Sequence, residues 1–174
     1  IWQSFDHPTD TLLPYANLGV NKRTGQSWFL KSWKTDDDPG TGNFSVKFNA
    51  SGKSQLFMYN KFAPWWRAGS FNGEILVGDP FMRRATPTDC GFNFTDDDNE
   101  VGIAFHAYDE NILSRVVVLQ SGFFQAFLWN FDEKKWDKDW SAPKSDCDSY
   151  GSCGANGICD PLNFVGFRCS CLPG

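Results

Sequence analysis

The cysteine cluster near the end of the sequence is the feature that most limits what this chain can fold into. Of the 6 cysteines, all but Cys90 follow residue 145, with the spacing Cys147-x5-Cys153-x5-Cys159-x9-Cys169-x-Cys171. The intervals are rich in glycine, aspartate and proline, which favour turns. A segment this short cannot fold by apolar collapse alone, so covalent cross-links must take the place of a core. Closing a loop of about a dozen residues with a disulfide removes roughly 3 kcal/mol of unfolded-state entropy.

Zinc is the alternative explanation for clustered cysteines. The segment contains no CxxC pair and no histidine, which structural zinc sites commonly use. We therefore expect disulfides, and neither a metal nor a cofactor. The sequence leaves the pairing of Cys90 and of Cys171 open.

Composition and sequons indicate an oxidising, extracellular environment. Hydrophobic residues make up 41% of the 174 residues, which is enough for a core. The net charge of −5 and the lack of a basic run argue against nucleic acid and anionic membrane surfaces as partners. No apolar stretch is long enough to cross a bilayer. N-glycosylation sequons begin at Asn43, Asn49 and Asn93.

Alternating and turn-flanked apolar segments predict an all-β fold. Phe44, Val46 and Phe48 alternate with polar residues, as in a half-buried strand. Further strands are expected at 27–34, 55–59, 101–107, 112–119 and 123–131, with a short edge strand near Leu12. Short strands at this spacing predict a sandwich, a barrel or a prism.

Several residues could have a functional role, but each also has a simpler structural explanation. Trp65 and Trp66 beside Arg67 could form a sugar platform, but core and cation–π packing is the commoner arrangement. The run Asp36–Asp38 lacks the spacing of a calcium loop and indicates a solvated turn. His106 is expected to be structural. No GxSxG, HExxH or phosphate-loop motif occurs, so we expect no enzymatic activity and no catalytic residue.

The terminal segment resembles an epidermal-growth-factor-like module, through its cysteine spacing, Gly154 and the Cys169-Ser170-Cys171 step. The resemblance implies the disulfides Cys147–Cys159 and Cys153–Cys169. The partner of Cys171 is then expected beyond residue 174, and the chain is expected to be a fragment.

The rest of the chain resembles the extracellular part of plant S-domain (G-type lectin) receptor kinases and S-locus glycoproteins. The segment WQSFDHPTDTLLP, residues 2–14, resembles the closing signature of the bulb-type lectin domain. A second block that recurs in this family is matched at Trp66, Arg67, Gly69, Asn72 and Gly73. Ala68 and Ser70 depart from it, and Phe71 replaces a tryptophan there. A third match comprises Ser114, Arg115, Gly122, Trp129, Trp136, Trp140, Pro143, Asp146, Cys147, Asp148, Tyr150, Cys153 and Gly154.

This resemblance implies a fold, a domain order and a function. The fold would be β-prism-like and related to bulb lectins. The domains would be a lectin tail at 1–19, an S-locus glycoprotein domain at 20–144 and a truncated module at 145–174. The parent protein would be a single-pass receptor with an intracellular serine/threonine kinase. This chain would be the segment outside the cell that recognises a ligand, such as a pollen signal, and contributes to receptor homo- or heterodimers.

Two alternatives remain: a carbohydrate-binding lectin, and a secreted S-locus-type glycoprotein without a kinase. The mannose motif of bulb lectins, Gln-x-Asp-x-Asn-x-Val-x-Tyr, is missing from the sequence, which argues against direct sugar binding at that motif. An extracellular protein or peptide is therefore the favoured ligand, with carbohydrate second. Ligand-contact residues cannot be named, and the exposed candidates are the expected loops at 36–41, 62–70 and 83–99.

Overall fold

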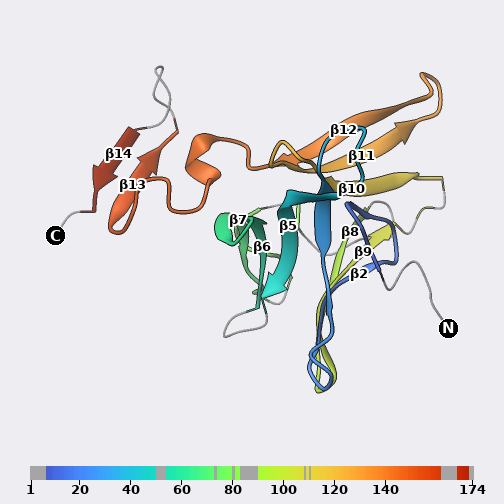
Figure 1. Cartoon of the computed structure of the whole chain (residues 1–174), viewed down its shortest axis with the longest axis horizontal. Coiled ribbons are helices and arrows are strands. Elements are labelled where there is room, and N and C mark those ends of the chain that lie inside the picture. The colour runs from blue at the N-terminus through green and yellow to red at the C-terminus, as the bar shows by residue number, and fades with distance from the viewer. Residues whose placement is uncertain are drawn as a thin grey trace.

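A computed structural model describes residues 7–49, 54–72, 74–79, 81–82, 90–107, 109, 111–161 and 168–172. Within these ranges the chain forms β-strands and one short 3-10 helix, and it contains no α-helix. The main body consists of three four-stranded antiparallel sheets that enclose one core, as in a β-prism (Figure 1). This arrangement confirms the predicted all-β, prism-like fold.

The first sheet has the strand order β1-β10-β11-β12. These strands are Thr11–Leu12, Ser114–Val118, Phe124–Asn130 and Lys135–Ala142. The predicted edge strand near Leu12 is confirmed as β1. Strand β12 was not predicted, because only Trp140 and Ala142 of its residues are buried. Its hairpin with β11 extends past the other sheets, so most of its side chains face water (Figure 1).

The second sheet has the order β3-β2-β9-β8, formed by Ser27–Trp28, Asn17–Asn21, Glu100–Ala107 and Cys90–Asp96. Gly19 pairs with Gly102 across β2 and β9. A Cβ atom on Gly19 would lie 2.9 Å from the Gly102 Cα, so this pair of strands approaches too closely for any side chain at that position. Near the tip, the Lys22 ammonium forms an ion pair with Asp96 at 2.6 Å.

The third sheet has the order β4-β5-β6-β7, formed by Leu30–Trp33, Thr41–Asn49, Gln55–Asn60 and Ala63–Ser70. The alternation at Phe44, Val46 and Phe48 is confirmed, because all three are buried against the core. Strand β7 corrects the expectation of a loop at 62–70. Glycine and two tryptophans obscured its period-two pattern, and two irregularities interrupt its pairing with β6.

The core draws on all three sheets. The expected lectin tail, residues 1–19, supplies β1 and part of β2, and both Leu12 and Leu18 are fully buried. The division expected at residue 20 therefore does not separate two cores. The largest fully buried side chains are Phe105, Phe124, Leu12, Leu18, Leu30, Leu56, Met58, Leu76, Met82, Val46, Val101 and Val116.

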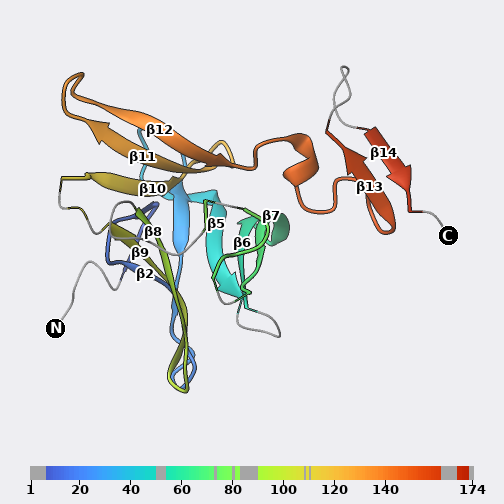
Figure 2. The same ribbon diagram turned by 180° about the vertical axis from the view of Figure 1, so that it is seen from behind.

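The terminal module lies beside the prism, next to β6 and β7 (Figures 1 and 2). It comprises a 3-10 helix, η2 (Asp146–Asp148), and the hairpin of β13 (Gly157–Asp160) and β14 (Arg168–Cys171). None of its described side chains is buried. The module therefore depends on cross-links, as its sequence suggests.

Candidate functional site

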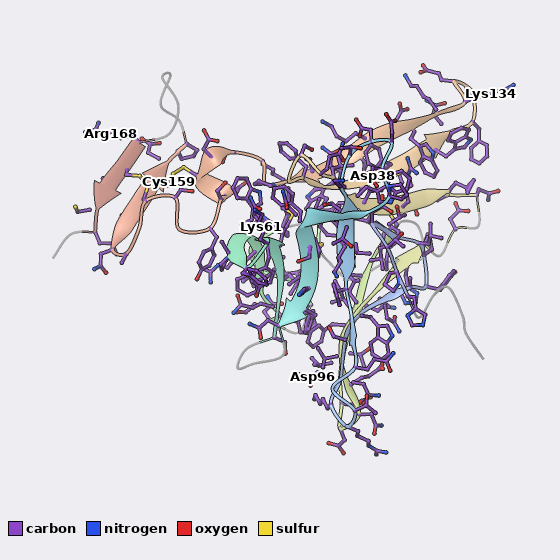
Figure 3. The ribbon with its side chains drawn as sticks, in the orientation of Figure 1. Asp38, Lys61, Asp96, Lys134, Cys159 and Arg168 are labelled. Atoms are coloured by element: carbon purple, nitrogen blue, oxygen red, sulfur yellow. A yellow bond between two sulfur atoms is a disulfide. The ribbon has the colours of Figure 1, made fainter. Side chains whose placement is uncertain are left out.

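The cysteines of the module form two disulfides in the structure, Cys147–Cys159 and Cys153–Cys169. Their Cα–Cα distances are 5.5 and 5.4 Å, within the normal range for disulfides. Figure 3 labels Cys159, which forms the first of these two bridges. Cys171 takes part in neither bridge and is exposed, and the half-buried Cys90 on β8 also lies outside both.

The sequon asparagines differ in their exposure. Asn43, at the start of β5, is exposed, whereas Asn49 and Asn93 are half-buried. Asn49 ends β5, and Ala50 and Ser51 of its sequon lie outside the described residues. Asn93 lies on β8, the edge strand of its sheet. Asn43 therefore offers an attached glycan the most open path to solvent.

The predicted acidic turn is built from hydrogen bonds within the protein. The Asp38 carboxylate accepts a hydrogen bond from the Gly40 amide at 2.9 Å and pairs with the Lys34 ammonium at 3.1 Å. The Gly40 bond and then Lys34 lower the pKa of Asp38. Within the described ranges, no cluster of His, Cys, Asp and Glu side chains is arranged to hold a metal ion. Residues 83–89 of the third expected loop lie outside the described residues, and residues 90–96 form β8.

The tryptophan pair packs within the protein, as the structural reading predicted. Trp66 is buried and meets Trp140 edge-on, with ring centroids 6.1 Å apart. The Trp65 Nε1–H donates to the Gly122 carbonyl at 3.0 Å. Arg67 lies over the ring of Tyr150 at 5.7 Å. These tryptophans therefore do not form an open sugar platform.

The outer side of the β4-β5-β6-β7 sheet carries several cationic side chains that form no ion pair among the described residues. We call this surface the basic face and define it by Lys31, Lys47, Lys61 and Arg67. Lys31 and Lys47 both lie over the ring of Phe29, with their Nζ atoms 5.2 and 4.7 Å from its centroid. The four strands of this sheet contain no Asp or Glu.

A shallow open groove of about 490 Å³ lies on the basic face. We call it the basic groove, and its lining consists of Val20, Lys47, Phe48, Asn49, Tyr59, Lys61 and Phe62. Asn49 and Lys61 lie near opposite ends of the β5–β6 pair, because Asn49 pairs with Gln55 and Phe44 pairs with Asn60. The groove therefore runs along these two strands. Figure 3 shows Lys61 at the turn between β6 and β7, on the side nearest the module.

The aromatic side chains of the groove differ in their surroundings. Phe62 is 97% exposed, an unusual state for a phenylalanine. Tyr59 is half-buried, and desolvation, followed by the nearby Tyr150, raises its pKa. Tyr59 therefore remains a neutral phenol at physiological pH, with an aromatic ring available for contact.

The terminal module contacts the basic face at its β7 side and leaves the groove open. The Tyr150 amide donates to the Trp65 carbonyl at 2.7 Å, and the Tyr150 ring lies 6.0 Å from that of Phe57. Together with the Arg67 contact, these interactions place the module along one border of the face. The module and the groove are thus neighbours.

Of the described groove lining, the expected loops included only Phe62, because most of the other lining residues lie on strands β2, β5 and β6 and Lys61 directly follows β6. One signal was nevertheless present. Residues 39–73 contain no Asp or Glu but carry Lys47, Lys53, Lys61 and Arg67, in a chain whose net charge is −5. A local charge count would have identified this segment, although it could not have shown which side chains share a face.

Comparison with known proteins agrees with the architecture. The family model of the S-locus glycoprotein domain matches residues 66–174, and that of the D-mannose binding lectin matches residues 1–34. Both segments contribute strands to the same prism, since β1 pairs with β10 and β2 pairs with β9.

Similar curated proteins match across almost the whole chain. The G-type lectin S-receptor-like serine/threonine-protein kinase RKS1 of Arabidopsis thaliana is 39% identical over 99% of this chain and 20% of its own length. The receptor-like serine/threonine-protein kinase SD1-8 of the same plant is 39% identical over 100% of the chain and 20% of its own length. The S-locus-specific glycoprotein S6 of Brassica oleracea is 35% identical over 100% of the chain and 39% of its own length. The chain belongs to the S-locus glycoprotein domain family.

Proposed function

We propose that this chain is an extracellular ligand-recognition segment of a plant S-domain receptor-like serine/threonine kinase. The observation that carries the proposal is the match of the whole chain to receptor kinases, of which it spans only about a fifth. The two matching family models describe a lectin and an S-locus glycoprotein domain. In this proposal the chain itself has no enzymatic activity, and the kinase belongs to another part of the protein.

In this proposal the prism is the scaffold and the basic face is the surface that recognises the ligand. The module docks at the edge of that face through Tyr150, so a ligand in the groove can also influence how the module is held. A ligand that binds more tightly in one position of the module than in another would shift the equilibrium between receptor monomers and dimers. Such a shift is how recognition outside a cell becomes a signal.

The domain boundaries 1–19, 20–144 and 145–174, and the glycans on Asn43, Asn49 and Asn93, belong to this proposal. The module is expected to continue past Gly174, where Cys171 would find its partner. Among the described residues, none lies in a helix that could cross a membrane. A secreted S-locus-type glycoprotein is the second candidate, because the S6 glycoprotein of Brassica also matches the whole chain.

Peptide mapping of the protein purified from plant tissue tests the proposal. We expect glycans on the sequon asparagines, with Asn43 the most fully occupied, and oxidised Cys147–Cys159 and Cys153–Cys169 pairs. Recovery in the membrane fraction of the tissue supports the receptor, whereas recovery in its soluble extracellular fluid supports the secreted glycoprotein. Unmodified asparagines together with reduced cysteines would contradict an extracellular function.

A further inference from the structure

The basic groove combines positive charge with the exposed ring of Phe62 and the half-buried ring of Tyr59. We propose that it binds an acidic carbohydrate, a linear chain of uronic-acid residues. This assignment rests on the proposed recognition function and specifies the class of its ligand. The proposal depends on one observation: Lys47 and Lys61 line the same groove as the rings of Tyr59 and Phe62.

Charge favours an anionic ligand. Among the described residues that line the groove there is no Asp or Glu. Among the described residues, neither Lys47 nor Lys61 forms an ion pair, although the chain is acidic as a whole. Lys31 adds a further ammonium group beside Lys47, over the shared Phe29 ring. A ligand carboxylate that approaches these lysines therefore meets no competing carboxylate among the described residues that line the groove.

The groove geometry favours a carbohydrate over an acidic peptide. An extended peptide commonly binds by adding a strand to a sheet edge, where backbone groups are free. Strands β5 and β6 are interior strands, each paired on both sides, so the groove offers a sheet face instead of an edge. A pyranose ring has an apolar C–H surface that packs on an aromatic ring, and Phe62 presents such a ring at 97% exposure.

The groove also has room for a ligand that extends along it. The separation of Asn49 and Lys61 along β5 and β6 corresponds to roughly 20 Å at the rise of a β-strand. A linear oligosaccharide can therefore meet Lys47 and Lys61 with different sugar units. Asn49 itself is a sequon residue at one end of the groove, so a glycan attached there is the competing occupant.

Titration calorimetry with matched ligands tests the assignment on the full chain, secreted from plant cells so that its disulfides and glycans form. The probes are a linear oligogalacturonate, its fully methyl-esterified form and a poly-L-glutamate of equal charge. We expect the oligogalacturonate to bind, with an affinity that falls as salt rises. The ester and the poly-L-glutamate should each bind at least about tenfold more weakly.

Substitutions then locate the site. We expect Lys47→Gln with Lys61→Gln to weaken oligogalacturonate binding about tenfold or more, and Tyr59→Ala to weaken it as well. Lys138→Gln is the matched control, because Lys138 is an exposed strand lysine on the β11–β12 hairpin, and it should change nothing. Asn49→Gln should preserve or increase the affinity. Unchanged melting temperatures would show that each variant is folded.

Several results would overturn the assignment. If the methyl ester bound as tightly as the oligogalacturonate, ligand charge would have no role in binding. If poly-L-glutamate bound as tightly, the groove would be a site for acidic peptides and not for an acidic sugar. Loss of binding in Asn49→Gln would mean that the glycan of the chain itself forms the contact. Absence of oligogalacturonate binding, in a protein whose glycans and disulfides are in place, would exclude this ligand class while the recognition function stands.

Discussion

At the scale of single residues, Asp79 shows how a buried carboxylate links the prism to its C-terminal strand. Asp79 is 4% exposed, and both of its carboxylate oxygens accept the Trp140 indole N–H at 3.1 Å. The Phe81 amide donates to the same group at 2.9 Å, and the Lys144 ammonium lies 3.4 Å away. A buried charge is stable only when it is paired and hydrogen-bonded in this way.

Replacing Asp79 therefore has a predictable cost. Asp79→Ala leaves the Trp140 N–H without its acceptor and Lys144 without its partner, so we expect a loss of about 2–4 kcal/mol in the free energy of unfolding. Urea denaturation followed by tryptophan fluorescence measures it. The exposed Asp132→Ala serves as the control and should change stability by less than about 0.5 kcal/mol. Equal stability of the two variants would show that the Asp79 contacts contribute little.

His106 makes stability depend on pH. Burial lowers the pKa of His106, so the folded protein favours the neutral imidazole. The unfolded chain, with a histidine pKa of about 6.5, takes up the proton at higher pH than the folded chain does. The stability contributed by the neutral form is therefore present above that value and is lost as the pH falls through the lowered pKa.

We expect His106→Gln to flatten the decline in melting temperature between about pH 7 and pH 5. His7→Gln is the control, since His7 is exposed. Thermal denaturation of the three proteins across this range measures the effect. A decline in His106→Gln as steep as that of the wild type would assign the pH dependence to other groups.

At the scale of elements, β1, one of the two shortest strands among the described residues, contributes more to the core than its length suggests. Strand β1 has two residues, yet Leu12 is fully buried while its neighbour Leu13 is 45% exposed. Leu13 directly follows the strand, and the difference in exposure indicates that the two side chains lie on opposite sides of the backbone. Residues near the start of the chain thus complete the core formed by the later strands.

Leu12→Ala and Leu13→Ala form a matched pair. We expect Leu12→Ala to lower the free energy of unfolding by about 3 kcal/mol, because it leaves a cavity between β1 and β10. Leu13→Ala should cost well under about 1 kcal/mol. Chemical denaturation distinguishes them. Similar small losses in both variants would mean that β1 is not part of the cooperative core.

The elements also show what the sequence could and could not predict. Strand β5 was predictable because Phe44, Val46 and Phe48 alternate with polar residues. Strand β12 was not, because its hairpin extends past the core and only Trp140 and Ala142 are buried. Lys47 and Lys61 line the same groove because β5 pairs with β6 in a particular register. A local sequence pattern does not determine that register.

At the scale of the whole molecule, the prism and the terminal module are stabilised in different ways. The prism has a large apolar core, whereas the described part of the module buries no side chain and is held by two disulfides. Reduction should therefore act on the module alone. We expect hydrogen exchange after reduction to rise over residues 145–172 and to stay low in the strands between 27 and 131. Loss of protection throughout the prism would contradict two independently stabilised parts.

The central claim, that this chain lies outside the cell and recognises a ligand there, has one direct test. An epitope inserted at the exposed turn around Asp132, in the full-length natural protein, allows antibody labelling of intact plant protoplasts. We predict that the antibody labels unpermeabilised cells and that external protease removes the signal. Labelling that appears only after permeabilisation would place the chain inside the cell and contradict the account.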